Sequence, residues 1–160
     1  MTSTTTETAS NLWPPLLHFS LTYILLSALV TAILFAFDLN ANTGEAIGTL
    51  MGATVVGARK FVIDHRRAMQ RVEQLHFTLL AFAAIILITI AQLFVTVALV
   101  IGKDEMTAAY EEAKAALAGN AILVSSIAVI VMLLYFAIVY FSSGWFSRMF
   151  ARRLAATEKI

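Results

Sequence analysis

The chain has 160 residues, of which 60% are apolar and 13% carry a formal charge. An ordinary soluble domain has roughly 45–50% apolar and about 25% charged residues, so the composition excludes that class. The net charge is +1 and there is no cysteine, which excludes thiol catalysis, thiolate metal sites and disulfides within the chain.

Three uninterrupted apolar runs predict membrane-spanning helices. A helix needs about 20 apolar residues to cross the roughly 30 Å hydrocarbon core of a bilayer, and each run reaches that length without Asp, Glu, Lys or Arg. We therefore expect an all-α integral membrane helical bundle with spans at about 16–37, 77–101 and 120–146. Residues 1–15 are expected to form a disordered tail, whose lack of Lys and Arg is not typical of a cleavable signal peptide.

A fourth segment, 45–63, is less apolar, and only 46–58 is free of charge. Small residues repeat along it at intervals of about four, a pattern that lets another backbone approach closely and favours a packed span. The expected helix-packing residues are Gly44, Gly48, Gly52, Ala53 and Gly57. We therefore expect four transmembrane helices; the alternative is a re-entrant or buried helix that does not cross.

A stretch of helix-forming residues, 104–118, lies between the last two spans. Its apolar residues recur at helical spacing, which predicts a short extramembrane helix resting on the bundle, or alternatively a face that docks a partner. Gly119 and Asn120 are expected to separate this helix from the last span. Residues 16–147 then form a single transmembrane domain, followed by a basic cytoplasmic tail at 148–160.

Basic residues set the expected orientation, because Lys and Arg are retained on the cytoplasmic side of a membrane. Five of them lie at 59–71, at the end of the second segment and in the loop after it, and four lie in the C-terminal tail, against two in the third loop and none in the first. Both termini are therefore expected in the cytoplasm (N-in/C-in), beneath a bacterial inner membrane. The residues expected to orient the chain and to contact anionic lipid headgroups are Arg59, Lys60, Arg66, Arg67, Arg71, Arg148, Arg152 and Arg153.

Few residues could carry chemistry, although polar groups within spans are usually functional. The candidates are Asp38, Asp64, His65 and Gln92. Asp38 fits a helix-terminal turn, and Gln92 fits an interhelical hydrogen bond better than a substrate path. Asp64 and His65 are adjacent and could form an acid–base or metal pair, but a metal site needs three or four ligands. No zinc-protease, phosphate-loop or serine-hydrolase motif occurs, so we expect no catalytic residue, no metal and no cofactor.

The glycine- and alanine-rich second segment runs into Ala-Arg-Lys-Phe-Val-Ile-Asp-His at 58–65, and it follows a turn that contains Asp38. In these features the chain resembles a family of small, uncharacterised bacterial inner-membrane proteins. The resemblance covers most of the first three spans. It implies a four-span bacterial membrane protein and transfers no activity.

The leading functional hypothesis is a non-enzymatic accessory or assembly component of the inner membrane, because the chain is small and lacks a catalytic set. The expected partners are membrane lipids and either a second copy of the chain or another membrane protein, and not nucleic acid. A small oligomeric transporter or channel is the first alternative, although the first span lacks the carboxylate of small multidrug exporters. A lipid-acting membrane enzyme at Asp64 and His65 is the second.

Overall fold

The computed structural model describes residues 11–38, 43–100 and 103–157. Four α-helices make up the fold, namely α1 (Trp13–Ala36), α2 (Thr43–His65), α3 (Arg71–Val100) and α4 (Lys103–Thr157). No strand occurs within the described ranges. Each helix contains a segment long and apolar enough to cross a membrane, so the prediction of an all-helical fold with four candidate spans is confirmed.

Helix α1 begins three residues before the expected span at 16–37 and ends close to the predicted position. It starts at Trp13, within the tail expected to be disordered. Two prolines favour this start, because N–H groups in the first turn of a helix have no partner within the helix and proline has no N–H. At the other end the N–H of Phe37 bonds to Ile33 O at 3.0 Å. Asp38 follows in the left-handed region (φ 51°), a conformation that Asp tolerates well and that ends the helix.

Helix α2 lies at the centre of the bundle and packs against both α1 and α4. Its buried residues recur every three or four positions, which places them on one side of the helix. They are Thr49, Leu50, Ala53, Thr54, Gly57, Ala58, Phe61 and Val62. The core that they form with the other helices includes Phe19 of α1, Phe77 of α3 and Val139 of α4, all fully buried.

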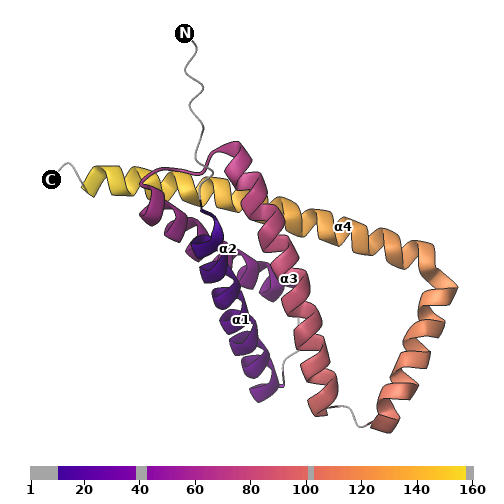
Figure 1. Ribbon diagram of the computed structural model, residues 1–160. Helices are drawn as coiled ribbons and strands as arrows, with labels where there is room; N and C mark the ends of the chain where they lie inside the picture. The colour runs from indigo at the N-terminus through magenta and orange to yellow at the C-terminus, as the bar shows by residue number, and fades with distance from the viewer. Residues whose placement is uncertain (1–10, 39–42, 101–102, 158–160) are drawn as a thin grey trace.

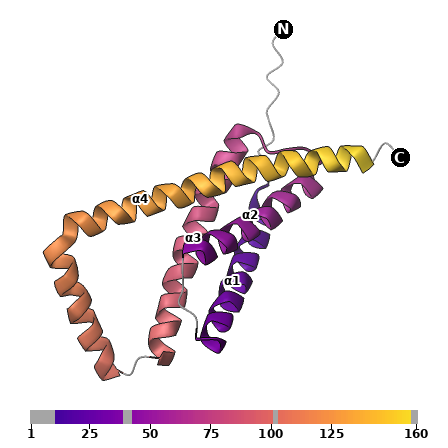
Figure 2. The ribbon, with the colours of Figure 1, turned by 180° about the vertical axis from the view of Figure 1, so that it is seen from behind.

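Helix α4 is a single long helix with one bend (Figures 1 and 2). Asn120 alone has a non-helical conformation (φ −134°, ψ 28°), so the expected helix at 104–118 and the expected span at 120–146 are two arms of one element. The helix continues to Thr157, so most of the expected basic tail is helical. Likewise α3 starts at Arg71, before the apolar run at 77.

The helices are arranged so that α1 begins and α4 ends at the same end of the bundle (Figures 1 and 2). The turn between α2 and α3 lies at that end too, whereas α1 and α3 terminate at the other. Residues 121–134 of α4 extend away from the bundle, and every one of them is exposed. From Tyr135 onward α4 lies against α2 and α3.

The stripe of small residues along α2, from Gly44 to Gly57, does not pack closely against the other helices along its whole length. A Cβ at Gly57 would lie 2.8 Å from Phe77 Cζ and 3.2 Å from both Phe19 Cβ and Pro15 O. At Gly52 it would lie 2.8 Å from Leu26 Cδ1.

By contrast, a Cβ at Gly48 would have nothing within 4 Å, and Gly44 is exposed. Ala53 is fully buried. Close helix approach within the chain therefore rests on the second half of the stripe.

These contacts predict opposite outcomes for the same substitution at two glycines of one helix. Gly57→Ala is expected to lower stability by about 1–3 kcal/mol, because buried aromatic rings and a backbone carbonyl leave no room for the methyl group. Gly48→Ala is expected to leave stability unchanged or slightly raised, since Ala is the better helix former. Thermal unfolding of the two variants in one detergent measures the difference, and equal melting temperatures would contradict this packing.

Candidate functional site

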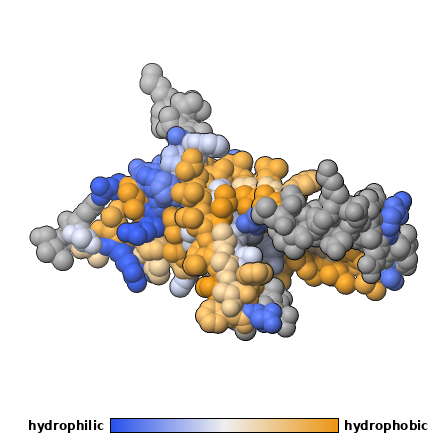
Figure 3. Space-filling view, turned by 90° about the horizontal axis from the view of Figure 1, so that it is seen from below, coloured by the Kyte–Doolittle hydropathy of each residue, from blue (hydrophilic) through white to orange (hydrophobic). Residues whose placement is uncertain are grey.

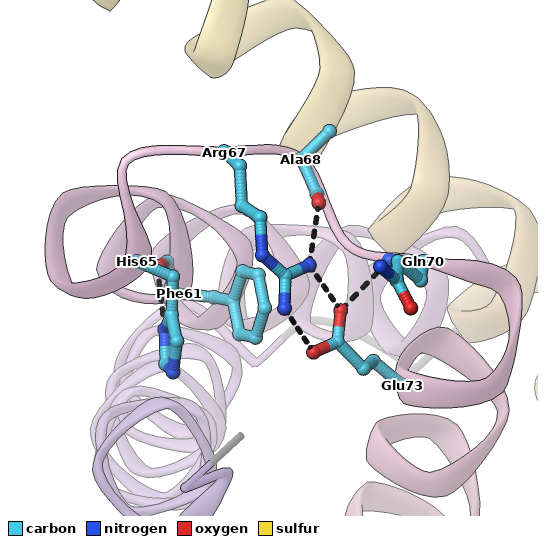
Figure 4. A network of polar contacts seen from close by, with 6 residues as sticks. All are labelled: Phe61, His65, Arg67, Ala68, Gln70 and Glu73. Atoms are coloured by element: carbon cyan, nitrogen blue, oxygen red, sulfur yellow. Dashed lines mark hydrogen bonds and ion pairs between the residues drawn. The ribbon is translucent and has the colours of Figure 1, made fainter. Parts of the chain in front are cut away.

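The turn between α2 and α3, residues 66–70, and the helix ends beside it bring charged and aromatic side chains together. Helix α2 ends at His65, and Arg66 follows in the left-handed region (φ 54°) while its N–H still bonds to Val62 O at 2.8 Å. The chain then runs directly into α3 at Arg71. As a result the end of one helix and the start of the next share a set of contacts (Figure 4).

Arg67 closes this turn through a bidentate ion pair with Glu73. Nη1 and Nη2 each lie 2.6 Å from one carboxylate oxygen, and Nη1 also donates to Ala68 O at 3.2 Å. Glu73 accepts the N–H of Gln70 at 2.8 Å as well, which caps the first turn of α3. A planar guanidinium matches both carboxylate oxygens at once, so the pair clamps the turn in place.

Phe61 lies between Arg67 and His65 (Figure 4). The guanidinium carbon is 5.6 Å from the ring centroid, and the His65 ring stacks on Phe61 at 4.2 Å and 14°. His65 Nδ1–H donates to Phe61 O at 3.1 Å, while Asp64 accepts from Lys60 at 2.7 Å. The structure therefore gives Asp64 and His65 different partners, and no hydrogen bond joins the two in the described part of the chain.

The remaining residues expected to face headgroups are exposed arginines. Arg66 and Arg71 lie at the turn, and the others are Arg59, Arg148, Arg152 and Arg153. Arg148 Nε donates to Gly144 O at 3.0 Å. The basic residues thus divide into two groups, because Lys60 and Arg67 bind carboxylates of the same chain whereas most of the others do not.

Gln92 makes an interhelical hydrogen bond, the interpretation that its sequence position favours. Its Nε2 donates from α3 to Ser27 Oγ of α1 at 2.6 Å.

A second bond of this kind was not predicted. Gln74 is buried at the start of α3 and donates to Tyr140 O of α4 at 2.5 Å. Gly144 makes room for it, since a Cβ there would lie 2.5 Å from Gln74 Nε2. The apolar run begins only at 77, so a glutamine at 74 has the sequence signature of a loop residue.

The described residues contain no group of three or more His, Cys, Asp or Glu side chains that could hold a metal ion. What they do contain is a set of polar contacts that join neighbouring helices and close a turn. Four helices able to cross a membrane, packed in this way, define a multi-pass helical membrane protein. In comparisons with models of protein families, with curated proteins and with solved structures, the chain finds no match.

The bidentate ion pair predicts that the effects of substitutions at Arg67 and Glu73 on stability are coupled. Arg67→Gln and Glu73→Gln are each expected to lower the free energy of unfolding by about 1–2 kcal/mol, because each leaves a partly buried charge without its partner. The double variant should lose less than the sum of the two. Arg67→Lys should recover little of the loss, since an ammonium cannot pair with both oxygens.

The exposed Arg152→Gln is the matched control and is expected to melt as the wild type does. Thermal unfolding in detergent gives all five values. Strictly additive effects of the two single substitutions would show that Arg67 and Glu73 are not coupled.

Proposed function

We propose that the chain is a multi-pass protein of a bacterial inner membrane, with both termini in the cytoplasm. In this proposal it acts as a non-enzymatic accessory or assembly component that binds another membrane protein or a second copy of itself. The observation that carries the role is the outward-turned segment of α4 at 121–134, a part of the fourth candidate span that its own bundle leaves uncovered.

The orientation is supported by where the basic residues lie. The α2–α3 turn and the last turns of α4 occupy the same end of the bundle, and α1 begins there (Figure 1). Residues 59–71, around that turn, and residues 148–153 of α4 together hold eight of the eleven Lys and Arg residues of the chain. Since Lys and Arg are retained in the cytoplasm, that end is the cytoplasmic one in our proposal.

The accessory role is supported by the surface of α4. Apolar side chains make up most of the surface of 121–134, and the large ones have exposed fractions that reach 86% at Ile122. A helix that is apolar all round is suited to hydrocarbon or to contact with other transmembrane helices. Small residues let such helices meet closely, and this segment has Ala121, Ser125 and Ala128 at intervals of four and three, on one face.

The polar side chains of the bundle also support a structural role. Gln92 and Gln74 join α3 to α1 and to α4, and Arg67 with Glu73 closes the α2–α3 turn. Each of these groups has a defined partner within the chain. Their contacts account for polar residues that would otherwise be candidates for substrate binding.

The orientation can be tested by single cysteines, because the chain has none of its own. Cysteines at Thr4 and Thr157 are expected to be protected from an impermeant maleimide in intact cells, whereas one at Thr43 should be labelled. Labelling of all three after permeabilisation is the control for reactivity. Labelling of Thr4 with protection of Thr43 would overturn the proposed orientation in favour of three spans.

The accessory role can be tested by purification in mild detergent and identification of what remains bound. Ala128→Trp is expected to release the partner without changing the melting temperature, because residue 128 is exposed in a segment of α4 that extends away from its own bundle. Leu29→Trp on α1, also exposed, is the matched control and should retain the partner. A wild-type chain that purifies alone as a monomer would contradict the proposal.

A further inference from the structure

One exposed stripe of α4 changes from apolar to basic side chains along its length. Leu134, Phe141, Trp145, Arg148 and Arg152 follow one another at intervals of seven, four, three and four residues, and all five are exposed. This spacing keeps them on one face of a helix. Along that face the side chains pass from aliphatic to aromatic to basic.

The opposite face of the same turns is held by the bundle. Phe146 and Ser147 are buried, and Phe150, Ala151 and Leu154 pack against the core. The last turns of α4 are therefore amphipathic and fixed in rotation. The Trp and Arg side chains of the stripe are consequently kept on the outer surface.

Ion pairing within the chain leaves a net positive charge at the end of the molecule that contains the α2–α3 turn and the last turns of α4. Among the described residues, the two carboxylates near it, Asp64 and Glu73, are bound by Lys60 and Arg67. Among the described residues, five arginines make no ion pair: Arg59, Arg71, Arg148, Arg152 and Arg153. Figure 3 shows hydrophilic side chains gathered where α2 and α4 end, beside a largely apolar surface.

The stripe places an aromatic residue beside the arginines of α4. Trp favours the interface between hydrocarbon and headgroups. Arg148 follows Trp145 by three residues, about 4.5 Å along the helix axis, and a headgroup region on one side of a bilayer is about 5–8 Å thick. With Trp145 at the edge of the hydrocarbon, the guanidinium of Arg148 is therefore within reach of the lipid phosphates.

We propose that Trp145, Arg148, Arg152 and Arg153, together with Arg59 and Arg71, form a docking surface for the phosphate headgroups of anionic phospholipids. Guanidinium groups donate paired hydrogen bonds to phosphate, and Arg148 keeps its remaining N–H groups for this purpose when Nε binds Gly144 O. Lys60 and Arg67, although basic and nearby, are not part of the surface. The inference rests on the proposed membrane location and needs neither a protein partner nor a particular orientation.

The test is a titration of the purified full chain, in a neutral detergent, with phosphatidylglycerol or phosphatidylcholine, read by native mass spectrometry. The wild type is expected to prefer phosphatidylglycerol by tenfold or more, and added salt should weaken that preference. Each arginine contributes about fivefold to such binding. The triple variant R148Q/R152Q/R153Q is therefore expected to bind phosphatidylglycerol at least tenfold more weakly, with an unchanged melting temperature.

Two matched variants separate charge from general surface effects. R148K/R152K/R153K keeps the charge and should retain most of the affinity, and Lys114→Gln removes an exposed positive charge elsewhere and should have no effect. Equal binding of the two lipids by the wild type, or an unchanged affinity of the triple Gln variant, would overturn the inference.

The titration is made in detergent and requires no partner, so its outcome is independent of the cysteine-labelling and purification results. A chain with the proposed orientation and partner but no lipid preference would lose only this inference. A chain with the lipid preference but the reverse orientation would lose only the proposed function.

Discussion

Close contact at Gly57 is the constraint on which the bundle depends. Lipid tails are as apolar as the helices, so burial of apolar surface adds little to helix association in a membrane, and contact and hydrogen bonding must supply it. At Gly57 the missing side chain lets α2 approach Phe19 of α1 and Phe77 of α3. Those two rings meet edge to face, 5.9 Å apart, so one glycine joins three helices at a single point.

Polar bonds then fix how each helix is rotated about that point. Gln92 binds Ser27 of α1, and Gln74 binds the carbonyl of Tyr140 on α4, so α3 is tied to a helix on either side. The second bond needs the absence of a side chain at Gly144. Glycine and glutamine thus play complementary parts, because one permits the approach that the other secures.

The positions of the helices could be predicted from the sequence because apolar runs and polar breaks are local features. The contacts could not. Gly48 and Gly57 belong to the same small-residue pattern, yet only Gly57 meets aromatic rings, since a pattern defines a face and not its neighbour. Arg66 and Arg67 are neighbours of the same residue type, so the sequence does not show which of them binds Glu73. The left-handed backbone at Arg66 turns the chain so that Arg67 reaches Glu73. The continuity of α4 was missed because Gly119 and Asn120 predict a break, and the structure has a bend there instead.

The packing of α4 also determines which of its charges can reach the membrane surface. Successive residues are about 100° apart around a helix. Gly144 faces Gln74, and the buried side of α4 includes Gly144 and Ser147. Arg148 and Arg152 therefore lie on the exposed side of the helix. A rotation by one residue would place Arg148 near the buried face, where an unpaired guanidinium is strongly unfavourable. The bond between Gln74 and Tyr140 O therefore does more than join two helices, because it selects the face that presents the arginines.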